Sequence, residues 1–227
     1  RTALHNPPEV LTWNIDKRYL RDLADAGLPV VPTTFLDPAD PETLDRPPSA
    51  GPLLGESGEV VIKPAISAGA RNTARYLLDD ATERARAVSH ADSLLREGRV
   101  VMAQPYLASV DTRGETAVVV VDGVVSHALR KGPLLQRGAE LDDALFAPED
   151  MGTRDATPAE VAVADAAVAH LVERFGRAPL YARVDLLAGD DDRPVLLELE
   201  LTEPSLFFGH APGSADRFAR AALARAR

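Results

Sequence analysis

The feature of this sequence that most constrains its fold is the segment LYARVDLLAGDDDRPVLLELELTEPS, at residues 180–205. Polar and apolar side chains alternate in both halves, as they do in strands that bury one face. The run GDDDRP between the halves supplies turn residues. The segment therefore predicts a β-hairpin in which Tyr181, Arg183 and Asp185 share one face of the first strand.

The register of this hairpin determines which side chains meet. A pairing that is symmetric about the centre of the polar turn places Asp185 opposite Glu198 and Arg183 opposite Glu200. In the second strand, Glu198 and Glu200 share their face with Leu196 and Thr202. The opposite face of the hairpin is then apolar, and it is formed by Ala182, Val184, Leu186, Leu197, Leu199 and Leu201.

Three carboxylates on one patch repel one another and are costly to remove from water, so we expect a cation among them. Hard oxygen ligands without cysteine suit Mg²⁺ or Mn²⁺. The sequence therefore predicts a metal site at Asp185, Glu198 and Glu200. The alternative is an exposed polar strand face on which Arg183 forms salt bridges with the acids.

Composition narrows the class of protein. The 227 residues suffice for one large domain or two modest ones, and 45% hydrophobic with 26% charged residues is typical of globular proteins. No run of 18 apolar residues occurs, and the N-terminus lacks the apolar region of a signal peptide. We therefore expect a soluble cytoplasmic protein with no membrane partner. Because the first residue is Arg rather than Met, the sequence can be a piece of a longer chain.

Several classes of chemistry are excluded by residue content. The absence of cysteine excludes disulfides, thiolate metal sites and cysteine nucleophiles. A net charge of −10 argues against nucleic acid as a partner. The five histidines are scattered and show no metal-binding spacing.

Helical and strand patterns alternate along the chain, yet the clear hairpins are antiparallel, which favours the α+β class. Asp122-Gly123 predicts a tight hairpin turn, and Thr157-Pro158 predicts a helix start. Irregular segments are expected at residues 1–12, 37–58 and 132–151. The expected strands are 30–35, 59–64, 72–78, 100–104, 115–121 and 124–131, and the expected helices are 16–26, 81–97, 158–175 and 214–226.

Basic side chains gather where strands end, at Lys63, Lys131 and Arg183, and Lys17 lies in the first turn of an expected helix. Lysines for phosphates and carboxylates for Mg²⁺ are the two halves of a nucleoside-triphosphate site. Taken alone, Lys17 is equally well an ordinary surface lysine.

Two loops have the composition of nucleotide-contacting segments. The small-residue loop at 66–71, with Ser67 and Gly69, can bring backbone amides to phosphate oxygens, or it can be a simple turn. Residues 104–107 leave a strand at Pro105, which we expect to stop the ladder. This second segment suits contact with an adenine edge, or it is a plain strand exit.

Seven motifs in this order resemble the ATP-grasp enzymes, and among them the stand-alone glutathione-synthetase-like or RimK-like ligases. The resemblance runs from about residue 10 to residue 213. The segments SAGARNTARY, SVDTRGET and LELELTEPSLF are similar in sequence to actinobacterial members of this family, including D-cycloserine-forming cyclo-ligases. The motifs are NIDKRYL, VVIKPAISAGA, AQPYL, GETAVVVVDG, ALRKGP, YARVDLL and LLELELTEPS.

The resemblance implies a role for each matching residue. Lys17 and Lys63 hold ATP phosphates, and the loop with Ser67 and Gly69 covers them as part of a lid. Two Mg²⁺ ions lie on the carboxylates named above, with Mn²⁺ as a substitute. The other implied residues are Gln104, Pro105, Tyr106 and Leu107 at the adenine, Glu115 at the nucleotide, and Lys131 and Arg183 as catalytic cations beside the phosphoryl group.

The resemblance also implies an ATP-grasp fold, in which two α+β subdomains grip ATP. Residues 1–27 form the lead and first helix of the core, 28–103 a lid-type subdomain, and 104–227 a C-terminal subdomain with the metal site. The domain that usually precedes this region in the family is absent from the sequence. The family usually has Asn where this chain has Glu200.

The implied activity is an ATP-dependent ligase that joins a small-molecule carboxylate to an amine, or a related nucleophile, through an acyl phosphate. The alternatives are a nucleotide-binding module without ligase activity and a small-molecule kinase. The sequence is compatible with a homodimer. Candidates for the substrate side are His127, Arg137, Glu203 and Ser205, each equally well a packing or surface residue.

Overall fold

The computed structural model describes residues 4–40, 54–137 and 150–226. The chain divides into two compact units, each an antiparallel sheet with helices, and this confirms the α+β class. The larger unit comprises residues 1–30, 107–133 and 149–227. The smaller unit comprises residues 31–106 and 134–148. Within the described ranges, no helix is both long and apolar enough to cross a membrane.

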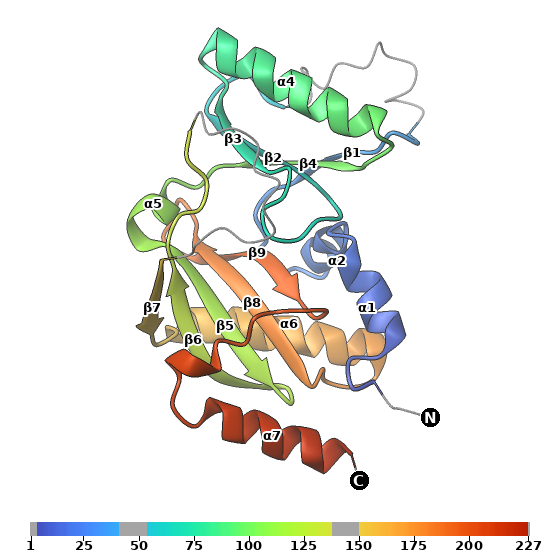
Figure 1. The fold of residues 1–227 in the computed structure, drawn as a ribbon, viewed down its shortest axis with the longest axis vertical. Helices are drawn as coiled ribbons and strands as arrows, with labels where there is room; N and C mark the ends of the chain where they lie inside the picture. Colours follow the sequence, from blue (N-terminus) through green and yellow to red (C-terminus); the bar gives the residue numbers. More distant parts are fainter. Residues whose placement is uncertain (1–3, 41–53, 138–149, 227) are drawn as a thin grey trace. The chain divides into compact units, whose positions relative to one another are not determined.

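The larger unit is built on a five-stranded antiparallel sheet (Figure 1). Its strand order is β7 (Met151–Arg154), β6 (Val124–Lys131), β5 (Glu115–Val121), β8 (Tyr181–Ala188) and β9 (Pro194–Glu200). Only β8 is paired with β9 among these strands, so β9 is an edge strand. The predicted strands at 115–121 and 124–131 are confirmed.

The two faces of this sheet are covered by different helices. The long helix α6 (Pro158–Phe175) contacts β5, β6, β8 and β9, and its Glu160 accepts a hydrogen bond from Thr116 of β5. The C-terminal helix α7 (Ser214–Arg225) contacts β5 and β6, and its Phe218 packs with Val119. Because Thr116 and Val119 point to opposite faces of β5, α6 and α7 lie on opposite sides of the sheet (Figure 1).

Shorter helices lie at the margins of the larger unit. The helices α1 (Pro8–Ile15) and α2 (Tyr19–Asp25) contact the outer edge of β9 through hydrogen bonds from their side chains. A one-turn helix, α5 (Ser109–Arg113), contacts β8, and a short 3₁₀ helix, η2 (Phe208–His210), precedes α7.

The smaller unit is a four-stranded antiparallel sheet with one long helix. Its strand order is β1 (Thr34–Leu36), β4 (Val101–Pro105), β2 (Glu59–Pro64) and β3 (Ala74–Leu77). The helix α4 (Ala81–Arg96) packs against β2, β3 and β4. The core between them includes Val60, Ile62, Ala74, Tyr76, Ala87, Ala91, Leu94, Val101 and Ala103.

Local sequence signals explain how the elements begin and end. Asp80 caps α4 by accepting hydrogen bonds from the backbone N–H groups of Thr82 and Glu83. Thr157 and Glu160 form a reciprocal capping box at the start of α6, and Gly176 ends that helix in the left-handed region. The helix predicted at 158–175 is therefore confirmed.

The hairpin between β5 and β6 turns at Asp122 and Gly123, where φ is 52° and 80°. Positive φ at both central residues is the geometry that gives a tight turn the twist of its strands, and Asp-Gly adopts it readily. The predicted turn is therefore confirmed.

The N-terminal predictions were wrong in part. Residues 1–12 were expected to be irregular, but α1 begins at Pro8, because proline is tolerated at the first helical position. The helix expected at 16–26 begins only at Tyr19. The strand expected at 30–35 is β1 at residues 34–36, while Val30 forms one parallel bridge to Leu196.

Pro105 does not stop the β2–β4 ladder as expected. It pairs with Val60, and the next residue, Tyr106, donates its backbone N–H to the Glu59 carbonyl oxygen at 2.9 Å. The partner of β4 on its other side, β1, reaches only residues 101–103, so no ladder bond is required from the proline nitrogen.

Other boundaries differ slightly, and two expected loops fall largely outside the described residues. The strand expected at 72–78 is β3 at residues 74–77, and β7 begins at Met151, the last residue of an expected loop. Of the expected loops at 37–58 and 132–151, residues 41–53 and 138–149 lie outside the described ranges.

The β8–β9 hairpin confirms the predicted register at its acidic end. Arg183 pairs with Glu200 and Asp185 pairs with Glu198. A register shift after Asp185 then pairs Leu186 with Leu196, so Leu196 is fully buried and Leu197 is half-buried. The prediction that Leu197 faces the core in place of Leu196 was wrong, because this bulge breaks the alternation.

We expect Thr157→Ala to lower the free energy of unfolding by about 1 kcal/mol, because the α6 capping box loses its side-chain acceptor. Urea denaturation monitored by circular dichroism measures this change. Thr82→Ala is the matched control, because Thr82 is exposed in the first turn of α4 but is not its cap. Equal effects of the two substitutions would contradict the capping role.

Candidate functional site

A cluster of charged side chains lies on one face of the larger unit's sheet, and the strand register explains why. Residues paired across neighbouring strands point to the same face. Glu115 of β5 pairs with Lys131 of β6, and Asp185 of β8 pairs with both Ala117 of β5 and Glu198 of β9. These pairs bring side chains from four strands to one surface. The residues farthest apart in sequence, Glu115 and Glu200, are separated by 85 positions.

Arg183 is the most extensively bonded cation of this surface. Its Nε donates to Asp185 Oδ1 at 2.8 Å, and its Nη2 donates to Asp185 Oδ2 at 2.8 Å. The same Nη2 donates to Glu200 Oε1 at 2.5 Å. The guanidinium therefore joins two acids on neighbouring strands in a nearly buried arrangement, which fixes its plane.

Lys131 is the second buried cation. Its Nζ donates to Asp185 Oδ2 at 3.2 Å and forms an ion pair with Glu115. Asp185 is thus contacted by both Arg183 and Lys131, and only 2% of it is exposed. A buried carboxylate held by two cations is compensated, whereas the loss of either cation would leave a buried charge unpaired.

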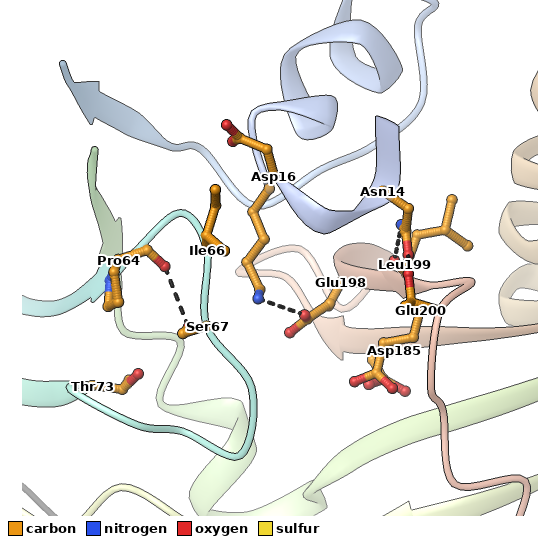
Figure 2. Close-up of polar contacts among 12 residues, drawn as sticks. Asn14, Asp16, Pro64, Ile66, Ser67, Thr73, Asp185, Glu198, Leu199 and Glu200 are labelled. Carbon is orange, nitrogen blue, oxygen red and sulfur yellow. Dashed lines mark hydrogen bonds and ion pairs between the residues drawn. The ribbon is translucent and has the colours of Figure 1, made fainter. Parts of the chain in front are cut away.

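Lys17 contributes from the short connector between α1 and α2. Its Nζ lies 3.0 Å from Glu198 Oε1, and the lysine is buried. Glu198, Glu200 and Asp185 lie close together in Figure 2, with the contact to Glu198 drawn as a dashed line. Figure 2 also shows Asn14 directed at the backbone of Leu199, the residue between the two glutamates.

Four carboxylates and three cations lie on this surface, so the acids outnumber the cations by one, although each acid contacts a cation. We refer to the group as the charged cluster. Its members are Lys17, Glu115, Lys131, Arg183, Asp185, Glu198 and Glu200.

The excess of negative charge is reflected in the pKa values of the acids. Burial, reinforced by repulsion from Asp185, raises the pKa of Glu115 to about 7 and that of Glu200 to about 8. Burial acts on Asp185 in the same sense, but the adjacent Arg183 and Lys131 outweigh it and hold the pKa of Asp185 well below its usual range. Negative charge in the cluster is therefore incompletely neutralised by protein side chains alone.

The donor set suits a divalent cation in its composition. Hard carboxylate oxygens with an unneutralised negative charge are the ligands that Mg²⁺ and Mn²⁺ prefer. As the side chains lie, however, no three His, Cys, Asp or Glu residues in the described part of the chain are gathered to hold an ion. The reason is that Asp185, Glu198 and Glu200 are each turned toward a cationic side chain.

In the smaller unit, Lys63 and Gln104 share a face of the sheet. Lys63 pairs with Met102, and Gln104 pairs with Val61, so both project from the face opposite to Ile62 and Ala103, which pack toward α4. Both residues are buried, and Gln104 Nε2 donates to Thr33 Oγ1 at 2.8 Å. This face of the sheet therefore carries polar side chains beside the apolar Val61 and Met102, whereas the α4 face is apolar.

The loop at residues 66–71 has the backbone of a tight, irregular turn. Gly69 and Ala70 both have positive φ, at 65° and 59°. Ser67 Oγ lies 3.4 Å from the Pro64 carbonyl oxygen, which is drawn as a dashed line in Figure 2. Successive residues in the left-handed region are strained for alanine and natural for glycine, which accounts for the glycine at position 69.

The segment after β4 is only partly exposed. Pro105 is exposed, while Tyr106 and Leu107 are half-buried. The Arg75 guanidinium carbon lies 3.4 Å from the Tyr106 ring centroid, a cation–π contact.

The four candidates for the substrate side are dispersed. His127 bonds to the Leu206 carbonyl oxygen at 2.9 Å, and the Ser205 carbonyl oxygen lies 3.4 Å from Arg183 Nη1. Glu203 is exposed, and Arg137 belongs to the smaller unit, where it pairs with Glu83 at 3.1 Å. The structure thus brings Ser205 to the charged cluster and leaves Arg137 in the other unit.

Two residues that bond to the strand backbone beside the charged cluster were not assigned a site role from the sequence. Asn14 and Tyr19 bond to the backbone of β9 beside Glu198 and Glu200. Both lie in the NIDKRYL motif, in which Lys17 alone was assigned a site role from the sequence. Their closeness to Lys17 in the sequence was the signal that could have indicated them. Phe207 was also missed, and it has a positive φ of 49° and a ring 5.5 Å from the Arg183 guanidinium.

Comparison with known proteins shows that the chain belongs to the ATP-grasp ligases, ADP-forming enzymes that make carbon–nitrogen bonds. It is 39% identical over 228 residues to the cycloserine biosynthesis protein DcsG of Streptomyces lavendulae. The aligned region covers 99% of this chain and 74% of that protein. The crystal structure of D-cycloserine synthetase DcsG superposes with a TM-score of 0.83 and 37% identity, over all of this chain and 75% of DcsG.

More distant structures share the fold. The ATP-grasp ligase PsnB with a minimal precursor has a TM-score of 0.60 at 25% identity, over 96% of this chain and 64% of PsnB. The D-alanine–D-alanine ligase of Bacillus anthracis has a TM-score of 0.59 at 18% identity, over 93% of this chain and 68% of that ligase. PsnB has also been solved with Mg and ADP, so these ligands occur in the family. No family model matches the chain.

We expect the free energy of unfolding, measured by urea denaturation in EDTA, to fall as the pH rises from about 5 to about 8. The folded-state pKa of Glu200 lies above its ordinary value of 4.5, so the folded chain keeps a proton that the unfolded chain has lost. The stabilisation is therefore complete below about pH 4.5 and is lost as the pH rises through about 8.

Glu200→Gln should flatten this pH dependence, because glutamine does not titrate. Glu203→Gln is the matched control, because Glu203 is exposed three residues further along the chain. An unchanged slope in Glu200→Gln would show that the raised pKa of Glu200 does not contribute to stability.

Proposed function

We propose that this chain ligates a small-molecule carboxylate to an amine or related nitrogen nucleophile, with ATP as the energy source and an acyl phosphate as the intermediate. The observation that best supports this proposal is the charged cluster, in which Lys131, Arg183 and three acids from β8 and β9 lie on one sheet face. A carboxylate and a triphosphate repel each other, so a catalyst for their reaction must supply positive charge at fixed positions.

The proposed reaction has two steps. In the first, a carboxylate oxygen of the substrate attacks the γ-phosphorus of ATP, the bond from that phosphorus to the bridging oxygen breaks, and ADP leaves with the electron pair. In the second, the nitrogen nucleophile attacks the acyl carbon and loses a proton, and the carbon–oxygen bond to phosphate breaks. The products are an amide, ADP and inorganic phosphate.

The side chains of the larger unit have distinct proposed roles. Arg183 and Lys131 are the catalytic cations, and each stabilises negative charge on the phosphoryl group during its transfer. Lys17 binds a phosphate oxygen, which its buried position beside Glu198 supports. Asp185 orients both catalytic cations through the bonds described above, and Glu115 holds Lys131.

The carboxylates of Asp185, Glu198 and Glu200 are the proposed metal ligands. Bound Mg²⁺, or Mn²⁺ in its place, supplies charge neutralisation to the β- and γ-phosphates. The support lies in the excess negative charge of the cluster and in the raised pKa of Glu200. These three acids would hold the ion through their carboxylate oxygens.

In the smaller unit, we propose nucleotide-binding roles for the polar sheet face and the loops beside it. Lys63 binds phosphate, supported by its position on the face opposite to α4. The backbone of the loop with Ser67 and Gly69 binds phosphate oxygens. The adenine contacts are assigned to Gln104, Pro105 and Tyr106 at the end of the sheet, and to Leu107, which follows them in the chain and belongs to the larger unit.

The substrate class follows from the relatives only as a proposal. DcsG is named as a D-cycloserine synthetase, and this chain is 37% identical to it. Small amino-acid derivatives that carry both a carboxylate and a nucleophilic nitrogen are therefore the first substrates to assay. PsnB has been solved in complex with a precursor peptide, so peptides form the second group of the panel.

We expect Asp185→Asn and Glu198→Gln each to lower turnover by about 10²-fold or more, because each removes charge that the transition state requires. The measurements are ADP and phosphate release together with mass spectrometry of the product, with folding checked by circular dichroism. Asp155→Asn is the matched control at an exposed acid between β7 and α6.

The product distinguishes the possible activities. Free phosphate with an amide supports the ligase, whereas a stable phosphoester would identify a kinase. Nucleotide binding without turnover on any substrate would identify a binding module. Near-normal turnover in both acid variants would remove these carboxylates from the mechanism.

A further inference from the structure

The outer edge of β9 is bonded by side chains of the N-terminal segment. β9 is the last strand of its sheet, and β8 occupies only one of its sides. A buried strand edge carries backbone N–H and C=O groups that must find partners elsewhere, because an unpaired buried polar group is costly. Leu199 and Leu201 direct these groups away from β8 and are fully buried.

Side chains from the N-terminal segment satisfy these groups one by one. The Leu199 N–H donates to Tyr19 Oη at 2.8 Å, and the Leu199 carbonyl accepts from Asn14 Nδ2 at 2.6 Å. The Leu201 N–H donates to Asn14 Oδ1 at 2.8 Å, and its carbonyl accepts from Asn6 Nδ2 at 2.8 Å. Asn14 gives this edge both a donor and an acceptor, so its amide takes the place that a neighbouring strand would fill.

These contacts are made at the residue between two of the proposed metal ligands. Leu199 lies between Glu198 and Glu200, so bonds to both its N–H and its C=O fix the two peptide planes that join it to the glutamates. Fixing those planes limits the directions in which the two glutamate side chains leave the strand. Ordinary core packing would not require a hydroxyl at Tyr19, which is only 2% exposed.

The same segment also carries Lys17. It follows Asn14 by three residues and precedes Tyr19 by two, and its Nζ contacts Glu198 at 3.0 Å. The two bonded residues thus hold both ends of the connector that presents this lysine. One arrangement therefore sets the backbone of the two glutamates and the position of the cation beside them (Figure 2).

We propose that Asn14 and Tyr19 are positioning residues of the ligase: by bonding to the edge of β9 around Leu199, they hold Glu198 and Glu200 in the orientation that binds magnesium with nucleotide. The inference rests on the proposed metal role of these two glutamates. It adds two residues that act through the strand backbone rather than on substrate or metal.

The test uses Tyr19→Phe, which removes one oxygen atom and leaves the aromatic packing with Trp13 in place. Titration calorimetry measures ADP binding to the intact chain in excess Mg²⁺ and in EDTA. The dissociation constant in EDTA divided by the dissociation constant in Mg²⁺ reports how strongly magnesium supports nucleotide binding. We call this quotient the magnesium ratio. We expect the substitution to lower this ratio about 10-fold, the scale of effect of residues that orient metal ligands, and to leave binding in EDTA unchanged.

A second readout reports on the strand itself. Hydrogen exchange followed by NMR should show faster exchange of the Leu199 amide in Tyr19→Phe, because that amide loses its acceptor. Asn14→Ala removes the bonds to Leu199, Leu201 and Thr202, and it should add faster exchange at Leu201 with the same fall in the magnesium ratio. If Asn14→Ala does not fold, Tyr19→Phe decides the question alone.

Tyr76→Phe is the matched control. It also removes a buried tyrosine hydroxyl, here bonded to His90 Nδ1 at 3.1 Å, but it lies in the smaller unit. We expect it to affect stability and to leave the magnesium ratio and the Leu199 exchange rate unchanged. An equal fall in the ratio for Tyr76→Phe and Tyr19→Phe would overturn the proposal, because the effect would then follow from lost stability.

Glu198→Gln separates failure of this inference from failure of the proposed function. If magnesium does not strengthen ADP binding in the unmodified chain, or Glu198→Gln leaves the ratio unchanged, the metal role itself is wrong and the inference falls with it. If Glu198→Gln lowers the ratio and Tyr19→Phe does not, only the positioning role is overturned.

Discussion

The balance of charge on one sheet face is the constraint on which the rest of the larger unit depends. Four carboxylates there are neutralised by only three cations, and Asp185 lies at the centre with bonds from both Arg183 and Lys131. Such a group is stable only while its geometry is kept, because displacing one partner leaves a buried charge unpaired. An excess of carboxylates over cations is also the composition that suits a divalent cation.

The antiparallel sheet supplies the geometry that this balance requires. Cross-strand pairing places Glu115 beside Lys131, Asp185 beside Glu198, and Arg183 beside Glu200 on rigid strands rather than on loops. The opposite face is apolar and packs on α6, so the same strands provide both a core and the polar surface.

Much of this could be predicted from the sequence where short-range signals decide the outcome. The register of Asp185 with Glu198 followed from alternation and the polar turn, and α6 followed from its cap residues. The bulge beyond Asp185 was missed because alternation alone cannot show where a strand gains a residue. The bonds from Asn14 and Tyr19 were missed because no local pattern connects them to a strand about 180 residues away. The roles of the cluster residues in binding and catalysis stay predictions.

That separation along the chain has a consequence for folding. Asn14 and Leu199 are 185 residues apart in sequence, and Tyr19 and Leu199 are 180 apart. Contacts of such high order form late, because the entropy of closing a long loop must be overcome before they stabilise anything. During synthesis on the ribosome, the N-terminal helices must therefore wait for the β8–β9 hairpin to emerge. Until that hairpin is present, the polar side chains of Asn14 and Tyr19 lack the strand edge to which they bond in the folded chain.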